Sequence, residues 1–153
     1  MDFLAALQAG PIGQIMTHHG VLVGAIFQFI HILGLVSLLT AVLIVAFRLL
    51  GWGLKQQSVQ EVTQFARPFF WVGLVAAGTS GFVMFASNAN AYASHPALQL
   101  KFGLLLAALT VQLGWVRYLV QQTQPNGWAR SGAVTSLALW FSVGLAGRAI
   151  GFI

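Results

Sequence analysis

Long apolar runs separated by short polar segments dominate this sequence. Four runs have the length of a membrane-spanning helix, and we predict helices at approximately 21–50, 68–87, 97–120 and 131–151. A helix needs about 20 predominantly apolar residues to cross the hydrocarbon core of a bilayer. The runs end at charged or helix-breaking residues, as Arg48 and Gly51 show after the first. The pattern therefore predicts an all-α fold, a four-helix transmembrane bundle.

The segments outside these runs complete the predicted organisation. Residues 1–20 contain two short apolar stretches split by Gly10-Pro11, which predicts a short N-terminal interfacial segment. Pro68 suits the first position of a helix, so we predict that the second helix begins there. The polar stretch Gln121 to Arg130 predicts a turn between the last two helices. The chain 1–153 is therefore expected to form a single transmembrane domain.

Composition agrees with a membrane protein and excludes several classes of function. Of the 153 residues, 58% are hydrophobic and only 6% are charged, whereas soluble domains carry about 25% charged residues. The chain has no cysteine, which excludes disulfides, thiolate metal sites and c-type haem attachment. The net charge of +5 comes from basic residues that are scattered singly, so we predict no nucleic-acid partner.

The distribution of basic residues predicts an orientation. Cytoplasmic loops of membrane proteins carry an excess of Lys and Arg. The loops after the first and third helices hold most of the basic residues, namely Arg48, Lys55, Arg67, Arg117 and Arg130. The opposite side has only Lys101 and Arg148, both inside helix ends. We therefore predict a multi-pass protein of a bacterial inner membrane, with periplasmic N- and C-termini.

Polar residues inside spanning helices are costly and mark candidate sites. His31 lies about ten residues, or about 15 Å, into the first helix. Gln28 lies one turn above it on the same face. Lys101 and Arg148 lie about one turn from the outer ends of their helices, and His95 just precedes the third helix. We predict that these residues gather on the outer side and form a cofactor-binding site.

The chemistry of this group favours an electronegative ligand. Asp2 is the only acidic residue on that side, so an external anion or carbonyl would complete the site. We predict b-type haem with His31 as an axial ligand, His95 as the second ligand, and propionates toward Lys101 and Arg148. A quinone or a lipid phosphate is an alternative partner. His31 as a hydrogen-bonded core residue, His95 as a loop residue, and the two cations as lipid-headgroup anchors also stay open.

The acidic residues are informative because there are so few of them. Asp2 and Glu61 are the only two, and neither lies inside a predicted spanning helix. A proton-coupled transporter normally carries a carboxylate within the membrane. No nucleophile–base pair is visible either. We predict no catalytic residues and favour a protein that is not an enzyme.

The sequence resembles a family of small bacterial four-helix membrane proteins of uncharacterised function. Three stretches carry the resemblance, His31 to Gly51, Ala97 to Lys101 with its leucine-rich continuation, and Ser136 to Arg148. Two features depart from the family pattern. An acidic residue often precedes the arginine of the first helix, where this chain has Phe47, and the third helix often ends near a histidine that Gln112 to Tyr118 lacks.

A more distant similarity is to copper-resistance D proteins and the membrane protoporphyrinogen oxidases. Both have a histidine in an early helix and a lysine that opens a later one, matched here by His31 and Lys101. The second group is associated with haem, so the resemblance implies a haem site. We expect electron transfer at the outer side of the membrane. The alternatives are an accessory subunit of a larger membrane complex and a quinone- or lipid-binding protein. The expected partners are the lipid bilayer and other membrane subunits or a homo-oligomer.

Overall fold

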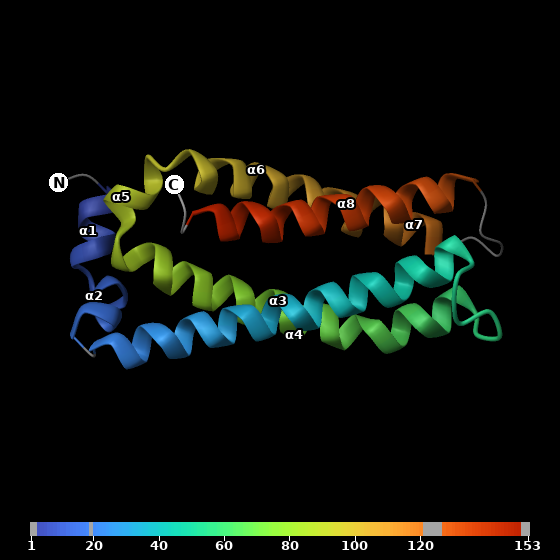
Figure 1. Ribbon diagram of the computed structural model, residues 1–153, viewed down its shortest axis with the longest axis horizontal. Coiled ribbons are helices and arrows are strands. Elements are labelled where there is room, and N and C mark those ends of the chain that lie inside the picture. The colour runs from blue at the N-terminus through green and yellow to red at the C-terminus, as the bar shows by residue number, and fades with distance from the viewer. Residues whose placement is uncertain (1–2, 19, 121–126, 151–153) are drawn as a thin grey trace.

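The structure is a computed structural model that describes residues 3–18, 20–120 and 127–150. All regular secondary structure in these residues is helical, which confirms the predicted all-α class. Long helical segments run along the molecule (Figure 1). They are α3 (Gly20–Leu50), α4 (Val59–Ser87), α6 (Pro96–Thr110) with its continuation through the π-helix η1 (Val111–Val116) into α7 (Arg117–Val120), and α8 (Gly127–Ala149).

The long helices form two antiparallel pairs, α3 with α4 and α6 with α8 (Figure 1). Contacts between α3 and α8 join the pairs. In the described parts of the chain, three helical stretches are long and apolar enough to cross a membrane, Val21–Leu50, Val59–Ser87 and Pro96–Val120. The helix α8 has 23 residues and is less apolar, because serine, threonine and arginine interrupt it. Three of the predicted spans thus meet this criterion, and α8 does not.

The prediction of four helices is wrong in number. The described residues also contain α1 (Phe3–Ala9), α2 (Pro11–His18) and α5 (Ala89–Ala93), and the predicted third helix includes the π-helical turn η1. The helix α1 packs on α5, and α2 packs on α4, so the N-terminal segment covers one end of the pairs (Figure 1). Hydrogen bonds from Asn90 N and Nδ2 to Gln8 Oε1, both 3.3 Å, help to hold it there.

The predicted start of the second helix at Pro68 is also wrong. The helix α4 begins at Val59, and Pro68 lies inside it. The Ser58 hydroxyl accepts a hydrogen bond from Glu61 N at 3.1 Å, and Ser58 N donates to Glu61 Oε2 at 2.7 Å. This reciprocal capping box satisfies main-chain donors at the helix start, and its sequence signature precedes the apolar run. Residues 121–126 of the predicted polar turn lie outside the described residues.

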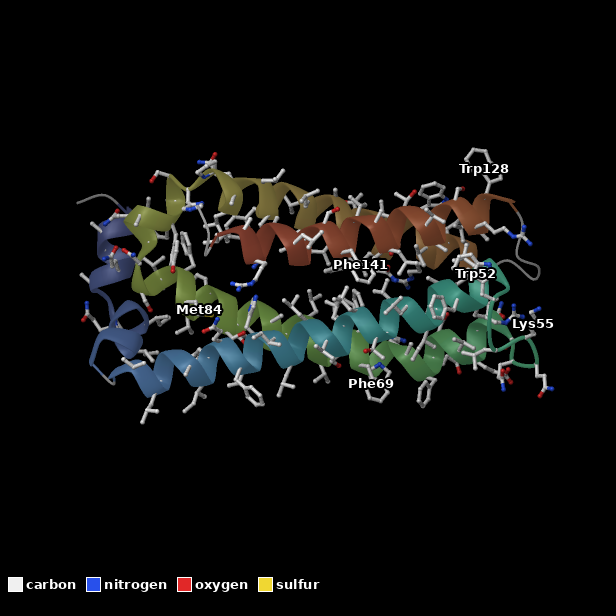
Figure 2. The ribbon with its side chains drawn as sticks, viewed as in Figure 1. Trp52, Lys55, Phe69, Met84, Trp128 and Phe141 are labelled. Carbon is white, nitrogen blue, oxygen red and sulfur yellow. The ribbon has the colours of Figure 1, made fainter. Side chains whose placement is uncertain are left out.

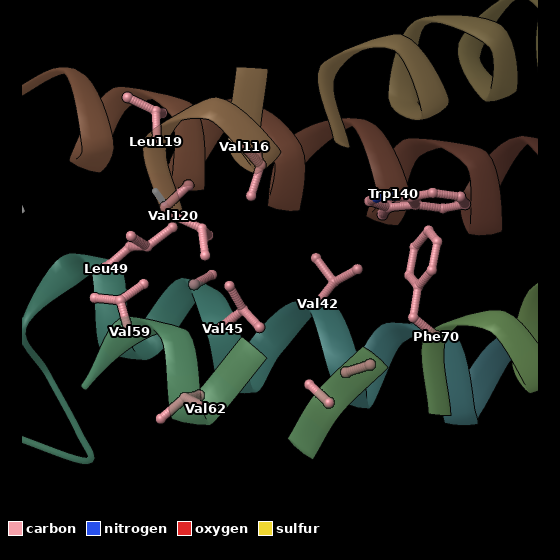
Figure 3. Packing of buried hydrophobic residues seen from close by; sticks show 14 of the residues in the cluster. Val42, Val45, Leu49, Val59, Val62, Phe70, Val116, Leu119, Val120 and Trp140 are labelled. Atoms are coloured by element: carbon pink, nitrogen blue, oxygen red, sulfur yellow. The ribbon is translucent and has the colours of Figure 1, made fainter. Parts of the chain in front are cut away.

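The buried core is concentrated in the half of the molecule away from α1 and α2. Phe70 and Trp140 meet there edge-to-face, with ring centroids 5.9 Å apart (Figure 3). Among the described residues, every buried hydrophobic side chain of α3 lies between Leu38 and Leu49. Trp52, Lys55 and Trp128 mark the end of that half (Figure 2). His31 lies in the half nearer α1 and α2, where the described part of α3 has no buried hydrophobic side chain.

Candidate functional site

His31 is held against α4 by its ring nitrogen Nδ1. This atom lies 2.8 Å from the Ala77 carbonyl oxygen and 3.2 Å from Ser80 Oγ. The ring is seated over Gly81, because a Cβ at that position would lie only 2.9 Å from His31 Cε1. The imidazole is half-buried. Two small residues and one main-chain carbonyl of α4 therefore fix the position of the ring.

The hydrogen-bond partners decide which nitrogen carries the proton. A carbonyl oxygen can only accept, and the Ser80 hydroxyl donates its own hydrogen to the Ala76 carbonyl. Nδ1 of His31 is therefore the N–H donor, and in the neutral ring Nε2 carries the lone pair. Nε2 makes no hydrogen bond to any residue that the structure describes. The ring thus presents one unused basic nitrogen.

Lys101 is the cation that the structure brings near His31. It lies in the second turn of α6, is half-buried, and is close enough to His31 for its charge to act on the imidazole. Its side chain crosses Gly147 of α8, where a Cβ would lie 3.0 Å from Lys101 Nζ. Arg148 is the next residue of α8 and is exposed. A histidine from α3 and a lysine from α6 therefore share one region.

The other two predicted site residues are placed differently. His95 occupies the N-cap of α6, and its Nδ1 is buried without a hydrogen-bond partner among the described residues. It precedes Lys101 by about six residues, or about 9 Å along the helix. Gln28 is exposed and makes no hydrogen bond with His31. In the described part of the chain, no three His, Cys, Asp or Glu residues gather as a metal site would require.

A cavity that the sequence did not predict lies at the opposite end of the molecule. It has a volume of about 370 Å³ and lies between α3, α4, η1 and α7. We call it the arginine cleft. Its polar lining residues are Gln60, Thr63, Gln64, Arg67, Gln112 and Arg117. Sequence reasoning treated both arginines as topology signals only, and no local signal marked the π-helix η1, which brings Gln112 and Val116 to the wall.

The comparison with protein families gives one match. Residues 3–153 match the model of a family described as a family of unknown function (DUF6644). The chain belongs to this family. No curated protein and no solved structure matches the chain. The expectation of an uncharacterised family is confirmed, whereas no link to the copper-resistance D proteins is shown.

Two features of this region fit a role for His31 as an axial ligand of haem iron, the hydrogen bonding of its ring and the nearby charge of Lys101. An iron-ligating imidazole binds through one nitrogen, and the other N–H usually donates to a carbonyl or carboxylate. His31 has that donor bond to Ala77 and an unused Nε2. Lys101 supplies a positive charge for a propionate. His95 lies about 9 Å along α6 from Lys101, and its Nδ1 is buried without a hydrogen-bond partner among the described residues.

Proposed function

We propose that this chain is a small integral membrane protein that binds b-type haem through His31. The observation that carries the proposal is the hydrogen bond from His31 Nδ1 to the Ala77 carbonyl, which leaves Nε2 free for a metal ion. To join α3 and α4 the imidazole needs only Nδ1, and Nε2 has no hydrogen-bond partner among the described residues. When bound, haem would supply one-electron redox chemistry at the outer side of the membrane.

The residues around the ring have separate roles in this proposal. The Ala77 carbonyl and Ser80 orient the imidazole, and the missing side chain of Gly81 leaves space for it. Lys101 is half-buried in a chain that contains only two acids, so a propionate is a natural counter-charge. Arg148 is the predicted second propionate partner, and His95 the predicted second ligand.

The proposal includes the membrane topology predicted from the basic residues. We propose that α8 is a fourth spanning helix and that both termini are periplasmic in a bacterial inner membrane. Cysteine substitutions at Ser58 and Asn90 test the orientation, because they lie at opposite ends of α4. A membrane-impermeant thiol reagent should label Asn90→Cys, and not Ser58→Cys, from the outside of intact cells. Labelling of Ser58→Cys would reverse the orientation.

The test of haem binding is a reduced-minus-oxidised absorption spectrum of protein purified from haem-replete cells. We expect a Soret band in the wild type and its loss in His31→Ala. Thr40→Ala is the control, because Thr40 is exposed on the same helix and its hydroxyl donates to the Val36 carbonyl of that helix. The His31→Gln variant keeps an amide donor for Ala77 and covers the case in which His31→Ala does not fold.

The outcomes of this experiment separate the remaining hypotheses. A wild type without a Soret band, or a band that is unchanged in His31→Ala, overturns the proposal. A colourless protein that co-purifies with other membrane subunits favours the accessory-subunit alternative. A colourless protein that binds a quinone or lipid near Lys101 and Arg148 favours the third alternative. His95→Ala tests the second ligand, since its loss should change the band position while His31 still holds the haem.

A further inference from the structure

The arginine cleft has the size and lining of a ligand site. Its volume of about 370 Å³ lies in the usual range of small-molecule pockets, roughly 300–1,000 Å³. On α4 alone its lining runs from Gln60 to Trp71, which is about 16 Å of helix. The cleft is therefore elongated along the helix axis. Its apolar lining residues are Ala41, Val42, Val45, Ala66, Phe70, Trp71, Leu113, Val116 and Val120.

Both arginines of the cleft lie at the level where lipid headgroups begin. About 20 residues separate Arg67 from the end of α4 at Ser87, which corresponds to about 30 Å. About 21 residues separate Pro96 from Arg117, or about 32 Å. The hydrocarbon core of a bilayer is about 30 Å thick. When Ser87 and Pro96 lie at one membrane surface, the guanidinium groups of Arg67 and Arg117 lie at the opposite surface. The apolar part of the cleft then extends into the hydrocarbon core.

The charge of the cleft is uncompensated by the protein. Arg67 and Arg117 line it, and no acidic residue does. Glu61 is the only acidic residue that the structure describes, and its carboxylate accepts the Ser58 N–H in the capping box. Neither arginine forms an ion pair with any residue in the described part of the chain. Guanidinium groups bind phosphate oxygens through paired, charge-assisted hydrogen bonds. The cleft therefore favours a phosphate from outside the chain.

The wall opposite α4 offers a neutral donor and an apolar surface. Gln112 Oε1 accepts a hydrogen bond from Ser136 Oγ at 2.6 Å, which fixes the amide and leaves its NH₂ group as a donor. The residue belongs to η1, and π-helical turns inside α-helices occur frequently at functional sites. Val42 and Val45 of α3 and Phe70 of α4 give the cleft an apolar lining. A ligand with one anionic end and one hydrocarbon end matches both parts.

We propose that the arginine cleft binds an anionic phospholipid of the cytoplasmic leaflet. Its phosphate lies between Arg67 and Arg117, and one acyl chain covers the apolar surface formed by Val42, Val45 and Phe70. A zwitterionic lipid offers the same phosphate together with a positively charged ammonium group, which two cations disfavour. The site is independent of His31 and lies at the other end of the molecule.

Lipid retention by the full-length protein in mild detergent tests this proposal. Native mass spectrometry would compare phosphatidylglycerol with phosphatidylcholine, and thermal unfolding would add inorganic phosphate as a third probe. We expect phosphatidylglycerol to be retained preferentially and to raise the Tm. A basic residue near an anionic lipid contributes about a five-fold change in affinity. Arg67→Gln and Arg117→Gln should each weaken retention by about five-fold, and the double variant by more.

Arg130→Gln is the matched control, because Arg130 is exposed at the same end of the molecule and does not line the cleft. Equal retention of the two lipids, or an equal loss in Arg130→Gln, overturns the proposal. An equal rise in Tm with inorganic phosphate alone assigns the site to free phosphate and overturns the lipid. If the double variant does not fold, the wild-type comparison and the charge-conserving Arg67→Lys decide. The haem spectrum of the same samples should not change, so failure of one proposal does not affect the other.

Discussion

The two helix pairs are held together in different ways. In the α3–α4 pair, main chains approach one another closely. A Cβ on Gly34 would lie 2.6 Å from Ala77 N, and one on Gly73 would lie 2.5 Å from Gly34 O. Around α8, the glycines instead face flexible side-chain ends. A Cβ on Gly132 would lie 2.5 Å from Leu119 Cδ1, and one on Gly147 would lie 3.0 Å from Lys101 Nζ.

This difference indicates where the molecule tolerates added side-chain volume. Close main-chain contact through small residues is a common way for membrane helices to associate. It leaves no side chain that can rotate to absorb added volume. His31 takes its hydrogen bonds from the α3–α4 pair, whereas Lys101 lies in the α6–α8 pair. The proposed iron ligand, His31, is thus fixed on the pair whose main chains are in close contact. The proposed propionate partner, Lys101, lies in the pair whose side-chain ends can adjust.

The largest expected effect follows from Gly73→Val. The added side chain would meet the main chain of Gly34 and Leu38, which cannot move without separating α3 from α4. We expect the free energy of unfolding to fall by about 3 kcal/mol, at the upper end of overpacking effects. Reversible unfolding in bicelles measures it. Gly78→Val on the same helix is the control, because nothing lies within 4 Å of its Cβ position. Equal losses in the two variants would refute the main-chain contact.

A smaller effect is expected for Gly132→Ala. The new methyl group would meet the end of the Leu119 side chain, which can change rotamer. We expect a loss of about 1 kcal/mol in the free energy of unfolding. A double-mutant cycle with Leu119→Ala identifies the cause, since the shorter side chain should remove most of the added cost. Additive losses would show that the two residues do not meet.

The smallest effect is expected for Gly144→Ala. Nothing lies within 4 Å of the Cβ position at this residue of α8. Alanine is the better helix former by about 1 kcal/mol in water, so stability should stay the same or rise slightly. Thermal unfolding of the purified protein checks this. A loss as large as that of Gly132→Ala would mean that another surface packs on Gly144.

The parts of the fold that depend on long local patterns could be predicted from the sequence. The first helix was expected at 21–50 and is found at Gly20–Leu50, because its apolar run is long and Gly51 ends it with a φ of 76°. The start of α4 does not follow from Pro68, because the capping box of Ser58 and Glu61 begins the helix at Val59. A proline that interrupts one hydrogen bond does not end a helix that makes extensive contact with α3.

The candidate sites were only partly predictable. His31 could be singled out because a polar side chain in an apolar run needs a partner. Its partner is the main-chain carbonyl of Ala77, and a carbonyl has no sequence signature. The arginine cleft depends on how α4, η1 and α7 meet, so no single segment encodes it. Arg67 and Arg117 are distant in the sequence, and only the fold shows that they line one cavity.

Pro68 leaves one main-chain hydrogen bond of α4 unmade. The ring removes the N–H that would meet the carbonyl of Gln64, and a helix bends most easily where such a bond is missing. On the C-terminal side of Pro68, Gly73 and Ala77 lie in close contact with the main chain of α3. On the other, Gln64 and Arg67 form part of the cleft wall. Because Val59, Val62 and Ala66 are also buried in the core, both stretches of α4 are anchored, and the missing hydrogen bond lies between Ala77, which holds His31, and the two polar residues of the cleft wall.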